Sequence, residues 1–300
     1  MTEDAIIIGG GFAGLSAATI LARARRRVTI FDTGTPRNRF ASHSHGVLAL
    51  DGKPGTAILE EARAQLSRYP TVTFVQAAAE RLEGERDDFR VVGSNGEAVH
   101  GRRVLLSTGF EDILPDVPGL AQFWGERVLH CPYCHGYELG GGALGVLASG
   151  PMSAHQATLL ADWGDVTLFT NEQPEPDAQS LSLLVERNVS FVSGKVEKVA
   201  GGDDGGLVVS TAHGYAVSVK GLFVAPQLKI RGGIPQALGL ATAESRVGPT
   251  IAIDGERQTS LPGLYAAGDI VLGAANITLA SADGVTAGLN IHRSLIWPSA

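Results

Sequence analysis

The sequence predicts an α/β protein with two Rossmann-like domains of the three-layer ββα type, the second inserted into the first. Three observations lead to this prediction. The chain opens with a strand, a glycine-rich turn and a helix; a second strand–helix–strand pattern begins near residue 143; and a strand and a long helix near the C-terminus complete the first pattern. With 300 residues, the chain is long enough for two domains that each bury a core.

The first elements follow from apolar runs. Residues 5–8 are continuously apolar, which predicts a parallel strand buried on both faces. Small and apolar residues predict a helix over 12–22, and residues 28–31 predict a second strand that ends at Asp32. The turn between the first strand and the helix carries the pattern G-x-G-x-x-G, made by Gly9, Gly11 and Gly14.

This glycine pattern indicates a dinucleotide-binding turn rather than an ordinary glycine-rich turn. A strand precedes it, a helix follows it, and the acid Asp32 lies roughly 20 residues beyond the glycines. Glycines let the backbone approach a pyrophosphate, which binds at the N-terminus of the helix. Asp32 would accept hydrogen bonds from an adenosine ribose.

The rest of the first domain is predicted more coarsely. The polar stretch 33–54 is too long for a simple connection, and long structured loops are usually functional. Ser107, Thr108 and Gly109 end a strand at a position that would face a bound cofactor. The remaining predicted elements are a helix over 56–68 and strands at 72–75, 89–92 and 103–106.

The inserted domain repeats the strand–helix–strand pattern. A strand is predicted at 143–147, a helix at 153–163 and a strand at 166–169, with a hairpin turn at the glycine- and aspartate-rich residues 201–206. Beyond it, residues 263–268 form a strand whose tip ends in Asp269, and a helix follows over 281–295.

The only two cysteines, Cys131 and Cys134, are spaced as C-x-x-C and followed by His135. In such a loop one thiol is commonly acidified, and its thiolate is the reactive form. A zinc site would need four ligands, but no second C-x-x-C is present, and His43 and His45 lack the i,i+4 spacing of ligands on a helix. We therefore favour a redox pair over a zinc site or an inert buried pair.

Composition excludes several functions. The net charge of −7 and a pI of 5.6 argue against nucleic-acid binding, which needs a basic face. No run of about 18 apolar residues is present, so no membrane span is predicted. The acidic start Met1-Thr2-Glu3-Asp4 is not a signal peptide, and two cysteines do not form a secreted disulfide scaffold. These features predict a cytoplasmic protein, in which a C-x-x-C is usually catalytic.

The glycine pattern, the C-x-x-C and the sequence Tyr265-Ala-Ala-Gly-Asp269 occur in an order and spacing that resemble the low-molecular-weight thioredoxin reductases. These are FAD-dependent pyridine nucleotide-disulfide oxidoreductases. The resemblance covers nearly the whole chain and implies an FAD domain from 1–116 and 243–300. It also implies a nicotinamide-type domain over 117–242 that carries the cysteines, and a homodimer.

The resemblance also implies roles for individual residues around FAD. Cys134 would lie next to the flavin and Cys131 would meet the substrate. His45, in the polar loop, would touch the flavin or the substrate, or be a surface histidine. The remaining cofactor contacts would be Gly9, Gly11 and Gly14 at the pyrophosphate, Asp32 at the ribose, Thr108 and Gly109 along the cofactor, and Asp269 at the ribityl chain. The stretch Ala274-Ala275-Asn276-Ile277 replaces the Arg-Gln-Ala of the family, so Asn276 and Ile277 would face the isoalloxazine.

One departure from the reductases concerns the residue after the second cysteine. Thioredoxin reductases carry an aspartate where this chain has His135. Cys-His-Gly-Tyr-Glu instead resembles the dithiol oxidases of disulfide natural products such as gliotoxin and holomycin. A histidine suits the removal of a thiol proton near pH 7. The alternative is a structural hydrogen bond of His135 within the loop.

The nucleotide site of the inserted domain is degenerate. Its glycine fingerprint reads Ala148-Ser149-Gly150-Pro151-Met152-Ser153, so alanine replaces the first glycine. The second strand leads into residues 169–177, which contain three acids where the NADPH-dependent reductases place arginines. Arginine binds a phosphate through two hydrogen bonds, whereas a carboxylate repels it. The sequence therefore disfavours NADPH and gives little support to NADH.

Together these observations predict an FAD-dependent thiol–disulfide oxidoreductase that oxidises a dithiol to a disulfide, with oxygen as acceptor and hydrogen peroxide as product. The substrate would be a small-molecule or peptide dithiol, or a thioredoxin-like protein. One alternative is a reductase that draws electrons from NAD(P)H or from a protein such as ferredoxin. Another is a flavoprotein redox sensor whose cysteines act as a switch.

Overall fold

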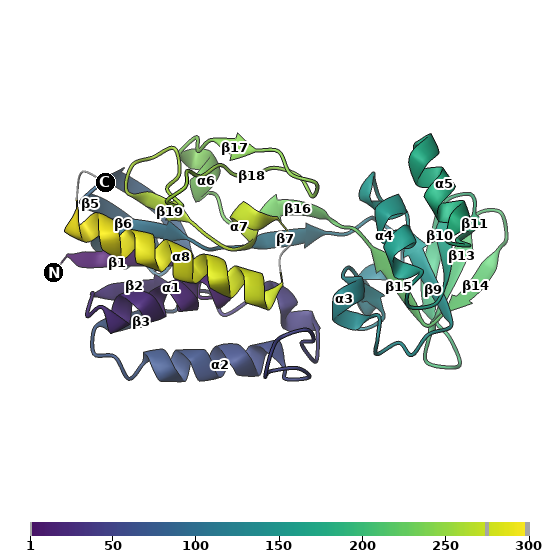
Figure 1. Ribbon diagram of the computed structural model, residues 1–300, viewed down its shortest axis with the longest axis horizontal. Coiled ribbons are helices and arrows are strands. Elements are labelled where there is room, and N and C mark those ends of the chain that lie inside the picture. The colour runs from purple at the N-terminus through teal and green to yellow at the C-terminus, as the bar shows by residue number, and fades with distance from the viewer. Residues whose placement is uncertain (1, 274–275, 298–300) are drawn as a thin grey trace. The chain divides into compact units, whose positions relative to one another are not determined.

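The computed structural model describes residues 2–273 and 276–297. It shows an α/β fold with parallel sheets covered by helices, which confirms the predicted fold class. The chain divides into two compact units (Figure 1). The first unit comprises Met1–Arg39, Thr56–Glu111 and Leu228–Ala300, and the second comprises Phe40–Gly55 and Asp112–Gln227.

The first unit is built on a seven-stranded sheet with the order β3-β2-β1-β6-β5-β4, in which β19 also pairs with β6. Its central strands pair in parallel, and the predicted strand segments at residues 5–8, 28–31 and 103–106 are buried. β4 and β5 form an antiparallel extension. The strands are β1 (Glu3–Ile8), β2 (Val28–Phe31), β3 (Val72–Val75), β4 (Ala79–Glu85), β5 (Asp88–Gly93), β6 (Ala98–Leu106) and β19 (Leu264–Ala266).

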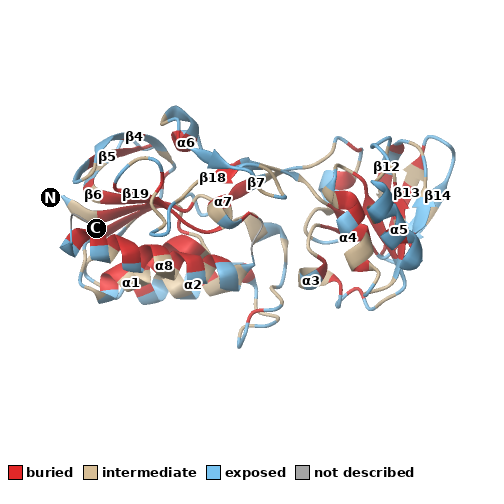
Figure 2. Cartoon of the chain, turned by 45° about the horizontal axis from the view of Figure 1, so that its top comes forward, coloured by how far each residue is buried: buried red, intermediate tan, exposed pale blue. Residues whose placement is uncertain are grey.

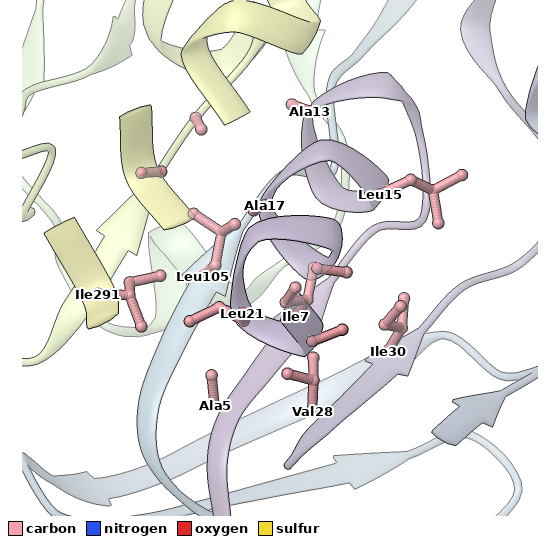
Figure 3. Packing of buried hydrophobic residues seen from close by; sticks show 14 of the residues in the cluster. Ala5, Ile7, Ala13, Leu15, Ala17, Leu21, Val28, Ile30, Leu105 and Ile291 are labelled. Carbon is pink, nitrogen blue, oxygen red and sulfur yellow. The ribbon is translucent and has the colours of Figure 1, made fainter. Parts of the chain in front are cut away.

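Two helices, α1 (Phe12–Arg23) and α8 (Ile277–Ile296), pack closely against each other in the first unit. Glycines make this approach possible, because a Cβ at Gly288 would lie 2.9 Å from the carbonyl oxygen of Ala17. Figure 3 shows Leu21 of α1, Leu105 of β6 and Ile291 of α8 in one buried cluster. Buried residues concentrate on the strands and on the inner faces of these helices (Figure 2).

The other elements of this part of the chain are short, except α2 (Gly55–Leu66). The short helices are η1 (Arg37–Phe40), α6 (Ile234–Ala237) and α7 (Asp269–Leu272). The short strands form two pairs: β7 (Phe110–Ile113) with β16 (Gln227–Ile230), and β17 (Thr242–Ala243) with β18 (Thr250–Ile251).

The second unit contains a five-stranded parallel sheet with the order β11-β10-β9-β15-β8. An antiparallel meander, β12-β13-β14, adds a second sheet, and residues 202–206 make its first turn as predicted. The strands are β8 (Val128–Leu129), β9 (Ala143–Leu147), β10 (Asp165–Phe169), β11 (Ser190–Val192), β12 (Val196–Gly201), β13 (Leu207–Thr211), β14 (Ala216–Val219) and β15 (Gly221–Val224). The helices are η2 (Leu120–Phe123), α3 (Pro132–His135), α4 (Met152–Leu160) and α5 (Ala178–Glu186).

The compact units differ from the predicted domain ranges at three places. Residues 228–242 belong to the first unit, because Ile230, Ile234 and Leu240 are buried in its core. Residues 112–116 belong to the second unit, and so does the 40–55 loop, which contains no strand and runs between η1 and α2. Which cofactor each unit binds stays a prediction.

No helix among the described residues is long and apolar enough to span a bilayer.

Candidate redox and cofactor sites

Cys131 and Cys134 form a disulfide in the second unit, with their Cα atoms 5.3 Å apart. Cys131 lies immediately before α3, and the backbone N–H of Cys134 donates to the Cys131 carbonyl at 3.2 Å. This helical turn brings the two side chains together, so the spacing C-x-x-C closes locally. Both cysteines are half-buried. Across residues 2–273 and 276–297 no group of three or more His, Cys, Asp or Glu side chains is arranged to hold a metal ion.

Aromatic residues flank the disulfide and anchor its loop. Tyr133 and Tyr137 are 69% and 83% exposed, and the Tyr133 ring packs edge-on against Trp163 at 5.3 Å between centroids. Gly136 has no room for a side chain, because a Cβ there would lie 2.8 Å from both the Pro132 carbonyl oxygen and the Trp163 ring. The anchored loop therefore exposes two aromatic side chains beside the disulfide.

His135 is placed to act as a base. It is half-buried at the C-terminal end of α3, directly after Cys134. Burial lowers the pKa of His135 below its ordinary value; the carboxylate of Glu138 acts in the opposite direction, and the ring of His45 adds to the lowering. The imidazole is therefore mainly neutral at pH 7 and can accept a proton.

His45 lies in the 40–55 loop, which belongs to the second unit. Its Nδ1 is 3.3 Å from Oδ2 of Asp51 and 3.4 Å from Oε1 of Glu138. The neighbouring His43 bonds Ser42 through Nδ1 at 2.9 Å. Sequence reasoning assigned Glu138 no role and did not single out Asp51, because only the folded loop brings these carboxylates to His45. A contact between His45 and FAD stays a prediction.

The glycine-rich turn of the first unit shows the space that a dinucleotide needs. Gly9 (φ +106°) and Gly14 are needed for packing within the protein. A Cβ at Gly9 would overlap the carbonyl oxygen of Ser107, and a Cβ at Gly14 would overlap the carbonyl oxygen of Gly9. A Cβ at Gly11 would meet nothing within 4 Å, although Gly11 caps the N-terminus of α1. The open space at a helix N-terminus is a suitable place for a pyrophosphate.

Asp32 lies beside this turn and organises it. Its Oδ1 accepts a hydrogen bond from the Gly10 N–H at 3.0 Å, and its Oδ2 accepts one from the Gly34 N–H at 3.0 Å. Arg63 of α2 pairs with Asp32 and donates to the Gly10 carbonyl at 3.2 Å. A cavity of about 230 Å³ adjoins the carboxylate, and it is lined by Asp32, Gly34, Arg63, Phe74, Val75 and Gln76. Sequence reasoning missed Arg63, because nothing local marks its contact with the turn.

Thr108 provides a second test of whether FAD fits. Its Oγ1 is buried and has no hydrogen-bond partner within the described part of the chain. The preceding Ser107 is satisfied by the Gly9 carbonyl at 2.8 Å, and Gly109 (φ +69°) accepts from the Arg231 N–H at 3.1 Å. A buried hydroxyl without a partner is costly unless a ligand completes it. Together with the space at Gly11, Thr108 fits a bound dinucleotide.

Asp269 and Gly268, which follow the strand β19, are bonded to other side chains of the protein. Asp269 begins α7 after Gly268 (φ +81°), and its Oδ2 lies 3.3 Å from Nη1 of Arg37. The Gly268 N–H donates to Oδ2 of the buried Asp283 at 2.8 Å. The contact of Asp269 with the ribityl chain stays a prediction.

In the stretch 274–277, which was predicted to face the isoalloxazine, Asn276 has a structural role. Asn276 caps α8, and its Oδ1 accepts from the Leu279 N–H at 2.8 Å. The helix therefore begins at Ile277 rather than at 281, because this cap makes the preceding turn helical. Ala274 and Ala275 lie outside the described residues, and the flavin contacts of Asn276 and Ile277 stay predictions.

The corresponding turn of the second unit is closed by its own side chains. The Ser149 N–H donates to Oγ of Ser153 at 3.0 Å, and the Ser149 hydroxyl donates to the Ala225 carbonyl at 2.7 Å. Asn171 accepts from the Val196 N–H at 2.9 Å through its side-chain oxygen. Of the three acids in the following segment, Asp177 caps α5 through the Ser180 N–H, which holds the pKa of Asp177 below its ordinary value.

Known proteins resemble this chain over its whole length. A family model described as "Pyridine nucleotide-disulphide oxidoreductase" matches residues 3–284. The crystal structure of an oxidoreductase from Agrobacterium tumefaciens is 43% identical and covers 100% of both chains with a TM-score of 0.94. The crystal structure of HlmI is 37% identical and covers 98% of this chain and 93% of that one, with a TM-score of 0.90.

A curated relative, "Thioredoxin reductase tcpT" of Claviceps purpurea (strain 20.1), is 34% identical and covers 89% of this chain and 86% of its own. Its name and the family model agree with the predicted resemblance, and the family binds FAD. The protein therefore belongs to the pyridine nucleotide-disulphide oxidoreductase family and is a thioredoxin reductase-like flavoenzyme that acts on sulfur groups.

Proposed function

We propose that this enzyme oxidises dithiols to disulfides through Cys131 and Cys134, in the manner of the dithiol-oxidase branch of the family. The observation that carries the proposal is the half-buried His135, a mainly neutral base directly after Cys134. A substrate with two free thiols must lose two protons, and a neutral base beside the disulfide suits their removal.

The residues of the second unit would perform the thiol–disulfide exchange. His135 accepts the proton of one substrate thiol, and the resulting thiolate attacks Sγ of Cys131. The disulfide breaks and Cys134 leaves as a thiolate. The second substrate thiol then loses its proton to the base and attacks the substrate sulfur of the mixed disulfide, which releases Cys131 as a thiolate. The substrate has lost two electrons and two protons. The electrons now lie on the sulfurs of Cys131 and Cys134, and the protons pass through the base to these sulfurs or to solvent.

The first unit would hold FAD through the turn at Gly11, Thr108 and the cavity beside Asp32. When bound, FAD supplies a two-electron acceptor that restores the disulfide, and dioxygen would take these electrons to give hydrogen peroxide. Carboxylate oxygens such as those of Asp32 suit the hydroxyls of a ribose.

The second unit supports the expectation that NADPH is not the electron source. The N–H of Ser149 is already bonded by Ser153, so it is not free for a phosphate. The exposed Glu172 and Glu175 lie where arginines would have to bind the 2′-phosphate. A like charge near this phosphate costs on the order of 1 kcal/mol, depending on screening.

A second candidate function is suggested by the printed names of relatives. tcpT of Claviceps purpurea and sirT of Leptosphaeria maculans are called thioredoxin reductases. A reductase would take electrons from NAD(P)H or a protein donor such as ferredoxin and reduce a thioredoxin-like disulfide. In either case we propose a cytoplasmic homodimer, as the family resemblance implies.

An anaerobic titration of the purified holoenzyme separates the two functions. With dithiothreitol as the probe dithiol, we expect the flavin absorbance near 450 nm to bleach, and oxygen uptake with peroxide formation to follow on admitting air. NADPH and NADH should bleach it far more slowly. Rapid bleaching by NADPH, with no oxygen uptake on addition of dithiols, would overturn the proposal in favour of the reductase.

A further inference from the structure

We propose that His45 is a second proton acceptor of the reaction, and that Glu138 is the positioning residue that couples it to His135. This inference rests on the proposed dithiol oxidation. It concerns four side chains of the second unit, His45, Asp51, His135 and Glu138, which we call the histidine–carboxylate cluster.

The contacts of His45 place it in the redox loop. Its Nδ1 lies between two carboxylate oxygens, 3.4 Å from Glu138 and 3.3 Å from Asp51. The His45 side chain is only 20% exposed, whereas that of Glu138 is 41% exposed. Glu138 is three residues beyond His135 in the disulfide loop, so a single carboxylate acts on both imidazoles.

The 40–55 loop is built to keep His45 in this place. Oδ1 of Asp51 accepts from the Gly46 N–H at 2.7 Å, which closes the loop around His45. The backbone of Ser44 bonds at both ends, donating to the Lys53 carbonyl at 3.0 Å and accepting from the Gly52 N–H at 2.9 Å. The histidine is therefore held by a compact, internally bonded loop rather than by a mobile surface strand.

The reaction deprotonates two substrate thiols in turn. A single imidazole can take only one proton at a time, so a second acceptor lets the second thiol react before the first proton has left. Protonating both histidines would be opposed by their mutual repulsion, since the charge of His45 disfavours a charge on His135. The two carboxylates of the cluster offset that repulsion. A pair of histidines with a pair of carboxylates can thus hold both protons until they leave to solvent.

Few other charges act on the cluster. The 40–55 loop adds His43, whose ring centroid is 6.4 Å from that of His45, and Lys53. The helix α4, which packs against α3, carries one ionisable side chain, the exposed His155. When the disulfide is reduced, the thiolates of Cys131 and Cys134 add negative charge near the cluster. Glu138 is therefore the acid whose removal should alter the coupling most.

Two substitutions with opposite expected effects test this inference. In holoenzyme, the ring resonances of His135 would be followed by NMR against pH and identified with His135→Asn. Glu138→Gln should lower the pKa of His135 because it removes the neighbouring negative charge, and His45→Gln should raise it because it removes a positive one. Glu197→Gln, an exposed acid on β12 of the same unit, is the matched control and should change neither.

The kinetic test uses the rate at which dithiothreitol reduces the disulfide, measured by acid quench, thiol alkylation and mass spectrometry. We expect His45→Gln to slow this reduction by about tenfold or more at pH 7. The ratio of wild-type to His45→Gln rate constants should rise with pH while dithiothreitol is still largely a neutral thiol, because only a neutral imidazole can accept its proton. The ratio should fall again at higher pH, where dithiothreitol is already a thiolate and needs no base.

Different results would contradict the role of His45 and the proposed dithiol oxidation. A ratio independent of pH, or shifts of the same sign in Glu138→Gln and His45→Gln, would overturn the role of His45. Failure of dithiols to bleach the flavin of the wild-type enzyme would instead overturn the dithiol oxidation, while the NMR titration would still report the coupling within the cluster.

Discussion

The two units share a strand–turn–helix plan but treat the turn differently. In the first unit, the turn leaves open space at Gly11 and is supported from outside by Asp32 and Arg63. In the second unit, Ser153 bonds the N–H of Ser149 within the turn itself. The difference supports the proposal that the first turn binds a dinucleotide, whereas the second turn satisfies its own backbone.

The two units also differ in net charge. The first unit has 17 Asp and Glu against 18 Lys and Arg, a net charge of +1, and the second has 14 against 6, a net charge of −8. The whole excess of acid therefore lies on the disulfide unit. A net charge of this sign would repel anionic nucleotides, and it fits the proposed use of neutral or cationic thiol substrates.

The largest effect should come from the cysteines, which only the second unit contains. Cys134→Ser should abolish flavin reduction by dithiols, with a loss of about 10³-fold or more, because the dithiol can no longer form. Cys131→Ser should leave a thiolate at Cys134 and produce a charge-transfer band at long wavelength. Absorbance spectra of the two variants check the order, and a band in Cys134→Ser alone would reverse it.

A matched pair of alanines tests the two turns directly. Gly11→Ala places a methyl group where the structure has free space, so the apoprotein should fold normally while FAD affinity falls about tenfold, or ~1.4 kcal/mol. Gly150→Ala also meets nothing within 4 Å and should leave FAD affinity and dithiol oxidation unchanged. Quenching of FAD fluorescence by deflavinated protein measures both. Equal losses in the two variants would contradict the proposed division of labour.

Arg63 should have a smaller effect on the same turn. Arg63→Met keeps much of the apolar stem over Phe74 but removes the contacts with Asp32 and the Gly10 carbonyl. Because the backbone of the turn remains, we expect FAD affinity to fall only about threefold to tenfold. The same fluorescence titration checks this, with Arg90→Met on β5, whose arginine pairs with Glu83, as the control.

The sequence predicted the parts of this molecule that depend on local patterns. Apolar runs located β1, β2 and β9, the glycines located the first turn, and the cysteine spacing located the disulfide. The start of α8 was missed because Asn276 was assigned to the cofactor, although its amide oxygen also caps a helix.

Tertiary contacts explain what could not be predicted. The assignment of residues 228–242 depends on which core receives Ile230 and Ile234, and an apolar side chain does not by itself specify the core in which it packs. The carboxylates around His45 come from two segments, at Asp51 and at Glu138, so no spacing rule joins them. Arg63 reaches the glycine-rich turn only because α2 packs beside it.

The smallest expected effect concerns the stability of the disulfide unit at acid pH. Burial lowers the pKa of His135 in the folded state, so the unfolded chain binds its proton more readily. The contribution of neutral His135 to stability is therefore fully present above its unfolded pKa of about 6.5 and is lost as pH falls through the lower folded pKa. Thermal unfolding between pH 8 and pH 5 should show a smaller decline in Tm for His135→Gln than for the wild type. The first unit, which contains His100 and His292, supplies the control, and His100→Gln should leave the decline in Tm unchanged. If Tm declines equally in His135→Gln and in the wild type, burial does not govern the protonation of His135.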